Sequence, residues 1–184
     1  KLTEQLRSKG FKLVGIIDPG IKCEKGYSVY DSGVAGDHFV RVADGEHYVG
    51  KVWPGESVWP DYTRGATRRW WADLYANFLK DGVSGIWNDM NEPADFTFAD
   101  GTIPLTVRHD NDGAPTDHRA VHNVYGMQMA RATFDGMKRA RPKERPFVLT
   151  RAGYSGVQRY AAVWTGDNLS SWEHLRMSVP MLLN

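Results

Sequence analysis

An incomplete α/β barrel is the fold class that this 184-residue sequence predicts. Segments typical of strands alternate with segments typical of helices, which favours a parallel sheet. The chain falls short of the roughly 250 residues of a complete (β/α)₈ TIM barrel, and helical patterns run into both of its ends. We therefore expect one domain, residues 1–184, that holds about half of a barrel. A polar side chain follows each of four predicted strands: Asp18, Asp89, Arg151 and Asp167.

The composition is that of an ordinary globular protein, with 41% hydrophobic and 24% charged residues. A net charge of +1 gives no electrostatic basis for binding nucleic acid or an anionic membrane. The single cysteine, Cys23, excludes an internal disulfide. We expect neither a signal peptide nor a membrane span, since no apolar run approaches about 20 residues. The compartment and the oligomeric state stay open.

The predicted elements alternate along the chain. Glycine, proline and capping residues set their limits. In order they are helix 3–9, strand 11–17, insertion 21–61, helix 62–81, strand 83–88, loop 94–116, helix 117–141, strand 146–150, strand 160–164 and a last helix opened by a Ser170-x-x-Glu173 capping box.

The segment 21–61 is predicted to be a β-rich insertion that projects from the end of the first strand. It is rich in glycine and aromatic residues and has no helical period. Short strands are expected at 40–42 and 48–53, with Asp44-Gly45 as a hairpin turn. The Trp-Pro pair at 53–54 returns at 59–60, which suggests either a binding wall or packing within the loop.

The two long helices are predicted from different signals. Helix 62–81 carries an aromatic stripe at three- and four-residue spacing, which indicates core packing. Helix 117–141 begins with Asp117 as its N-cap. His118 and His122 lie four residues apart on it and form a possible metal pair, although no Glu stands between them as in His-Glu-x-x-His. The alternative is that both are helix-surface histidines bonded to neighbours.

The stretch 83–93 combines an apolar strand with acids at its carboxyl end. Asp89 and Glu92 follow the buried pattern of Val83, Ile86 and Trp87 directly. Acids in this position are typical of the active sites of α/β barrels. The alternative for Asp89 is a capping role for the next segment. For Asp18, within Asp18-Pro19-Gly20, the alternative is an ordinary turn.

Two carboxylates on neighbouring strand ends suit glycoside hydrolysis, in which one attacks the anomeric carbon and the other protonates the leaving oxygen. Like charge at short range would raise the pKa of one of them. Asp167 precedes a predicted helix, whose dipole would oppose that rise. Arg151 could bind a sugar hydroxyl or pair with a carboxylate.

The stretch Trp87-Asn88-Asp89-Met90-Asn91-Glu92-Pro93 resembles the nucleophile signature of glycoside hydrolase family 31, the α-glucosidase and α-xylosidase family. The resemblance covers essentially the whole chain, in order. It continues at residues 17–19, 50–55, 122–126, 145–151 and 159–168, where the last motif ends in Trp164-Thr165-Gly166-Asp167-Asn168.

The resemblance implies a (β/α)₈ barrel enzyme that cleaves terminal non-reducing α-linked glucose by a retaining mechanism. Asp89 would be the nucleophile and Asp167 the general acid/base, with Glu92 supporting the nucleophile. Asp18 and Arg151 would bind sugar hydroxyls of an oligosaccharide or α-glucoside. No cofactor or metal is implied. The apolar walls of the sugar site would be Trp53, Trp87, Phe96 and Trp164.

Several alternatives remain. An α-xylosidase, an α-transglucosylase or a lyase of the same family would share both acids. A sugar-binding module without catalysis is a different class, and a metal-dependent hydrolase using Asp117, His118 and His122 is a third. Pocket residues that the family carries on later strands are absent here. We therefore expect residues 1–184 alone to be inactive or nearly so and poorly soluble.

Overall fold

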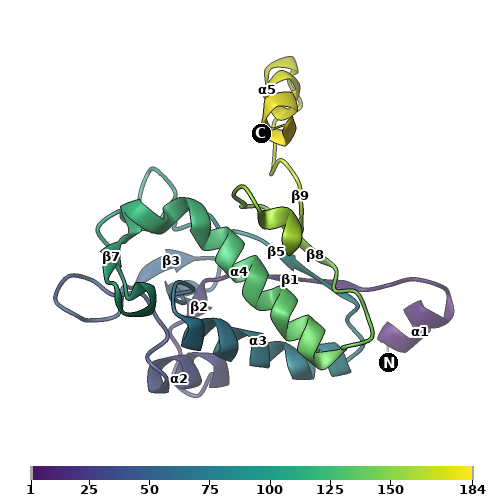
Figure 1. The fold of residues 1–184 in the computed structure, drawn as a ribbon, viewed down its shortest axis with the longest axis horizontal. Helices are drawn as coiled ribbons and strands as arrows, with labels where there is room; N and C mark the ends of the chain where they lie inside the picture. Colours follow the sequence, from purple (N-terminus) through teal and green to yellow (C-terminus); the bar gives the residue numbers. More distant parts are fainter. Residues whose placement is uncertain (1, 184) are drawn as a thin grey trace.

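A four-stranded parallel sheet forms the centre of the molecule (Figure 1). The computed structural model describes residues 2–183. The strands are β1 (Val14–Ile17), β5 (Gly85–Asn88), β8 (Val148–Thr150) and β9 (Ala162–Val163), and they neighbour one another in this order. All three pairings are parallel. Neighbours in the sheet therefore follow the order of the chain, as in consecutive strands of a barrel.

Helices α3 (Gly65–Lys80) and α4 (His118–Ala140) cover one face of this sheet (Figure 1). Ile86 and Val148 point to this side and are almost fully buried. The two helices approach closely at Gly136, where a Cβ would lie 2.5 Å from the Ala72 carbonyl oxygen. Asp117 caps α4 as predicted, since its side chain accepts a hydrogen bond from the Ala120 amide at 3.3 Å. The core thus lies between the sheet and these helices.

The opposite face of the sheet is largely bare. Ile16 is in register with Trp87, which is in register with Leu149. Ile16 is 53% exposed, and the other two are only partly buried. In a complete barrel this face points into the packed interior. The expectation of a buried strand over 11–17 is therefore wrong for this chain: pairing begins at Val14, and its lumen-side residues lack the remaining strands.

Residues 21–61 contain a helix that the sequence did not predict. Helix α2 (Ser28–Ala35) lies between β2 (Ile21–Lys22) and the hairpin of β3 (Gly50–Val52) and β4 (Gly55–Val58). The three strands form an antiparallel sheet in the order β2-β4-β3. The expected strand at 40–42 makes only isolated bridges. A separate apolar cluster fills this region: Val40, Tyr48, Val52, Trp59, Ile103 and Val107.

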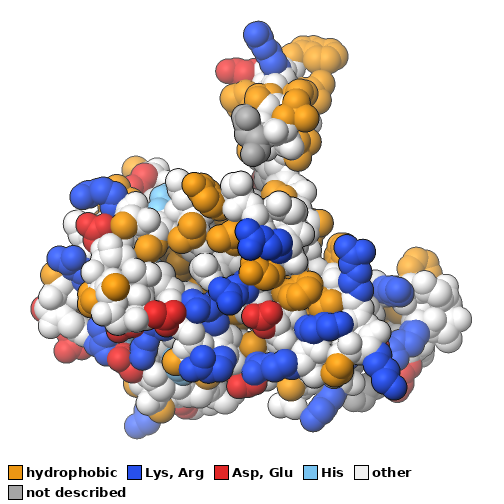
Figure 2. All heavy atoms as spheres, viewed as in Figure 1, with side chains coloured by type: hydrophobic (Ala, Val, Ile, Leu, Met, Phe, Trp, Pro, Cys, Tyr) orange, Lys and Arg blue, Asp and Glu red, His pale blue; other side chains and the backbone are white. Residues whose placement is uncertain are grey.

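The remaining elements are short, apart from the last helix. They are α1 (Leu2–Ser8), β6 (Arg108–His109), η1 (Asn111–Gly113), β7 (Thr116–Asp117) and η2 (Val157–Arg159). Helix α5 (Trp172–Leu183) projects away from the body and exposes its apolar side chains (Figures 1 and 2). Ser171, not Ser170, caps it, since Ser171 Oγ accepts from the His174 amide at 3.2 Å. None of the described helices is long and apolar enough to span a membrane.

Candidate functional site

One arginine connects the acids that follow the parallel strands. Arg151 stands directly after β8, where its amide donates to the Asn88 carbonyl of β5. Its Nη1 lies 3.3 Å from Asp89 Oδ1 and 3.7 Å from Asp167 Oδ2. The carboxyl ends of β5, β8 and β9 therefore bring together two carboxylates and a guanidinium from segments far apart in the chain. The sequence predicted that acids at strand ends would lie together, but it expected them on neighbouring strands, whereas β8 separates β5 from β9.

Glu92 pairs with Arg151 through both of its carboxylate oxygens. The guanidinium donates from Nε to Glu92 Oε1 at 2.7 Å and from Nη2 to Oε2 at 2.8 Å. Such a two-pronged pair fixes the plane of the guanidinium as well as its position. These hydrogen bonds raise the pKa of Arg151 above its ordinary value. Of the two roles left open for Arg151, the structure shows the pairing with carboxylates.

The separation of the two central carboxylates is bounded by their shared neighbour. Asp89 and Asp167 oxygens lie 3.3 Å and 3.7 Å from the same nitrogen, so they are no further apart than the sum of these distances, about 7 Å. This bound includes the roughly 5 Å that a retaining glycosidase needs. The dipole argument for Asp167 is wrong, because α5 begins five residues later, at Trp172, beyond the reach of a helix terminus.

Asp18 follows β1, the edge strand next to β5. Burial raises the pKa of its carboxyl above the ordinary 3.8, the charge of Asp89 adds to that rise, and Arg151 opposes it. Its Oδ1 is buried and has no hydrogen-bond partner among the described residues. A cavity of about 530 Å³ adjoins Asp18 along the open edge of β1. Asp18 is therefore more than a turn residue: it belongs to the same charged cluster.

Sequence reasoning missed the role of Asn91, a buried residue that holds the two neighbours of Arg151 by hydrogen bonds. Asn91 is fully buried between the two acids of its loop. Its Nδ2 donates to Thr150 Oγ1 at 2.8 Å, and its Oδ1 accepts from the Ala152 amide at 3.1 Å. It thus clamps the residues on either side of Arg151. In the sequence Asn91 is only an uncharged amide between Asp89 and Glu92. No periodic pattern marks such a residue as buried or as part of the site.

The four aromatic residues assigned to the sugar walls form two pairs. Trp87 and Trp164 meet edge to face with ring centroids 5.2 Å apart. Trp53 and Phe96 do the same at 4.8 Å. Trp53 is 73% exposed and Phe96 is 46% exposed, so their faces are open to solvent. Open aromatic faces can stack on the apolar faces of sugars.

Comparison with known proteins places this arrangement in a family. The whole chain, residues 1–184, matches the model of the glycosyl hydrolases family 31 TIM-barrel domain. The chain belongs to glycoside hydrolase family 31. Its fold is accordingly part of a TIM barrel, as the alternation of strands and helices predicted.

Family 31 relatives extend well beyond this chain. Alpha-glucosidase 2 of Bacillus thermoamyloliquefaciens is 50% identical over 184 residues, which are all of this chain and 23% of that protein. A crystal structure of the glucosidase II alpha subunit bound to Glc1Man2 superposes with a TM-score of 0.87 and 41% identity, covering 99% of this chain and 20% of that one. A crystal structure of a family 31 dextranase of Flavobacterium johnsoniae with isomaltotriose superposes with a TM-score of 0.78 and 30% identity, covering 91% of this chain and 20% of that one. The chain spans about a quarter or less of these relatives.

The histidines of α4 do not form a metal site in the described part of this family 31 chain. His118 is fully buried, so its expected place on the helix surface is wrong. Its Nδ1 contacts His109 Nε2 at 3.0 Å, and His109 Nδ1 contacts Asp61 Oδ1 at 2.9 Å. Burial lowers the pKa of His118 to about 3, with smaller contributions from His109 and His122. Within residues 2–183 no three His, Cys, Asp or Glu side chains are placed to hold a metal ion.

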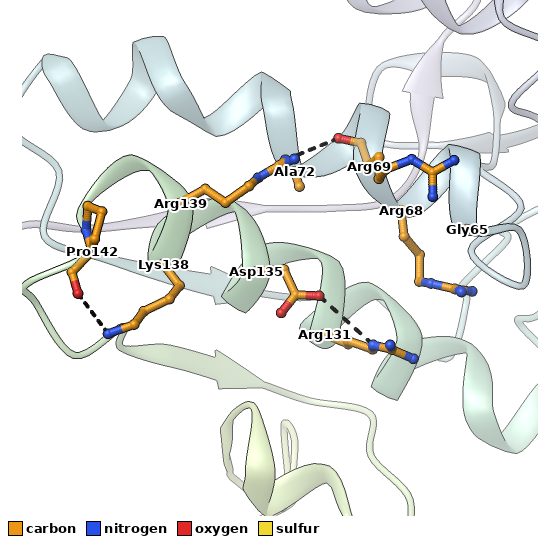
Figure 3. A pocket seen from close by; sticks show the side chains of 9 residues that line it. All are labelled: Gly65, Arg68, Arg69, Ala72, Arg131, Asp135, Lys138, Arg139 and Pro142. Atoms are coloured by element: carbon orange, nitrogen blue, oxygen red, sulfur yellow. Dashed lines mark hydrogen bonds and ion pairs between the residues drawn. The ribbon is translucent and has the colours of Figure 1, made fainter.

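A groove of about 870 Å³ lies between α3 and α4, away from the strand ends (Figure 3). Two of its cationic side chains already have partners: Arg139 binds Asp73 at 2.8 Å, and Lys138 donates to the Pro142 carbonyl at 2.9 Å. It contains no pair of carboxylates. The cluster around Arg151 is therefore the candidate active site.

Proposed function

We propose that the protein containing this chain is a retaining α-glycoside hydrolase that releases terminal, non-reducing α-linked glucose. The observation that carries the proposal is the contact of Asp89 and Asp167 with one guanidinium nitrogen, at 3.3 Å and 3.7 Å. A retaining mechanism needs two carboxylates roughly 5 Å apart, and this shared contact limits their separation to about 7 Å, which supports the proposal. The names of family 31 relatives, α-glucosidases among them, support glucose as the sugar.

In the first step, a carboxylate oxygen of Asp89 attacks the anomeric carbon. The bond from that carbon to the glycosidic oxygen breaks, and Asp167 transfers its proton to the departing oxygen. In the second step, the Asp167 carboxylate takes a proton from water while the water oxygen attacks the same carbon and the bond to Asp89 breaks. Both acids return to their first state, and two inversions retain the configuration.

The charge balance of the cluster suits this chemistry. Asp18, Asp89, Glu92 and Asp167 supply four carboxyl groups around the single guanidinium of Arg151. The transition state of glycoside cleavage resembles an oxocarbenium ion and gains positive charge. Fixed carboxylates stabilise charge of that sign where it develops.

The other residues of the site position the substrate. The free Oδ1 of Asp18 accepts a hydrogen bond from a sugar hydroxyl, and Arg151 donates one from the edge that faces the acids. Glu92 acts by holding Arg151. The aromatic pairs Trp87–Trp164 and Trp53–Phe96 supply apolar walls. No group in this scheme is a metal or cofactor.

The test is hydrolysis of 4-nitrophenyl α-glucoside by the complete protein. Asp89→Ala is expected to lower kcat by at least about 10³-fold, because the covalent step loses its nucleophile. Asp135→Asn, at an exposed position of α4 in the groove between α3 and α4, is the matched control and is expected to leave kcat unchanged. Proton NMR of the first-formed glucose is expected to show the α anomer. A variant Asp89→Ala within tenfold of wild type, or β-glucose as first product, would reject the proposal.

A further inference from the structure

Asp95 is a buried carboxylate that the catalytic scheme does not use. It lies in the loop after β5, six residues beyond Asp89, and its side chain is fully buried. Burying a charged carboxylate costs free energy unless hydrogen bonds compensate it. No cation pairs with Asp95 among the described residues, so neutral donors supply that compensation. A buried charge held in this way calls for a structural or functional reason.

The donors to Asp95 come from two separate segments. Its Oδ1 accepts from the Lys51 amide at 3.0 Å and from the Thr97 amide at 2.8 Å, and its Oδ2 accepts from the Tyr48 hydroxyl. Gly50 makes the approach possible, because a Cβ there would lie 2.2 Å from Asp95 Oδ2. The carboxylate therefore ties strand β3 and the residues before it to the loop after β5.

This tie lies next to the exposed aromatic pair. The amide of Phe96 donates to the Lys51 carbonyl at 2.8 Å, so the two backbones run side by side. Trp53 stands two residues after Lys51, and Phe96 directly follows Asp95. Their rings meet edge to face at 4.8 Å although both are substantially exposed. Exposed side chains lose conformational entropy when they are held in one geometry, so the backbone beneath must fix them.

We propose that Asp95 is a positioning residue that holds the Trp53–Phe96 pair and thereby sets how tightly the enzyme binds its sugar substrate. The proposal rests on the proposed function, since it assigns Trp53 and Phe96 to substrate binding. The hydrogen bonds of the Asp95 side chain go to Tyr48, Lys51 and Thr97 and to none of the proposed catalytic acids, so Asp95 acts through the aromatic pair. Its loss should therefore raise KM while changing kcat little.

The experiment is a double-mutant cycle in the complete enzyme with maltose as substrate. Asp95→Ala is expected to raise KM about tenfold with kcat within about threefold, because three hydrogen bonds that fix the pair are lost. In a Trp53→Ala background the same change is expected to raise KM less than about twofold, since coupled residues are not additive. Asp95→Asn, which can still accept from both amides, is expected to restore KM to within about threefold of wild type. An unchanged KM in Asp95→Ala, or fully additive effects, would overturn the proposal.

A second measurement does not depend on turnover. Acrylamide quenching of Trp53, taken as the difference between proteins with Trp53 and with Trp53→Phe, reports how freely that ring moves. Asp95→Ala, or Tyr48→Phe if the former does not fold, is expected to increase this quenching. Unchanged quenching would overturn the positioning role. Increased quenching in a protein without α-glucosidase activity would support that role and reject the proposed function instead.

Discussion

Replacing Arg151 by lysine keeps the positive charge but removes the bidentate fork, the pair of parallel hydrogen bonds from the guanidinium to Glu92. The guanidinium donates two hydrogen bonds to Glu92, at 2.7 Å and 2.8 Å, and reaches Asp89 and Asp167 with its remaining nitrogen. An ammonium group is a point donor and cannot satisfy all three carboxylates in one plane. A hydrogen bond to a charged group contributes about 1.5–3 kcal/mol. Lysine can replace one of the two hydrogen bonds to Glu92, so the variant loses about 2 kcal/mol of the free energy that orients the site.

This loss corresponds to a decrease of about 30-fold in kcat/KM, since each 1.4 kcal/mol is a factor of ten. The assay is hydrolysis of 4-nitrophenyl α-glucoside by the complete protein, with Arg119→Lys as the control. Arg119 is mostly exposed and lies 3.8 Å from its nearest carboxylate, Asp117, so its exchange is expected to change nothing measurable. Activity of Arg151→Lys within threefold of wild type would refute the idea that the fork organises the site.

Three further changes test Asp18, Asn91 and the exposed face of the sheet. Asp18→Asn is expected to lower kcat/KM about tenfold or more by weakening a charged hydrogen bond to substrate. Asp18→Asn is also expected to raise the Tm at pH 7, because folding raises the pKa of Asp18 and the ionised carboxylate therefore destabilises the folded state. The Tm difference from wild type should vanish below pH 3.8, where this carboxyl is protonated in both states. A Tm difference that stays the same at low pH would contradict this reasoning. Asn91→Ala is expected to lower the free energy of unfolding by about 2 kcal/mol, because the half-buried Ala152 amide loses its acceptor, and a denaturant midpoint equal to wild type would refute that role. Residues 1–184 expressed alone are expected to bind a hydrophobic dye and to lack glucosidase activity, because one sheet face is bare; full activity would contradict the barrel.

The parts of the fold that could be predicted are those with strong local signals. The stripe of Trp71, Tyr75 and Leu79 predicted α3, and the structure buries these three side chains. Acids placed after apolar runs predicted the end of the sheet where Asp89 and Asp167 both approach Arg151. In both cases the signal lies within a few consecutive residues, which is why sequence alone was sufficient.

The parts that were missed depend on contacts between distant segments. Helix α2 has β-branched residues and a glycine in place of an apolar stripe, and it is held by tertiary contacts such as Tyr30 with Phe39 and Trp70 Nε1 with Ser32 Oγ at 3.1 Å. The roles of Asn91 and Asp95 depend on partners more than forty residues away. No periodicity records such contacts, so only the fold could reveal them.

The central claim is that Asp89 and Asp167 act on one sugar ring, with Asp89 as nucleophile. A 5-fluoro-α-glucosyl fluoride traps the covalent intermediate of a retaining α-glucosidase because the fluorine slows its hydrolysis. Peptide mapping by mass spectrometry of the labelled complete protein is expected to find one glycosyl ester, on Asp89, and Asp167→Ala is expected to be labelled at the same residue. A label on Glu92 or Asp167, or no label in a protein that still hydrolyses the glucoside, would contradict the account.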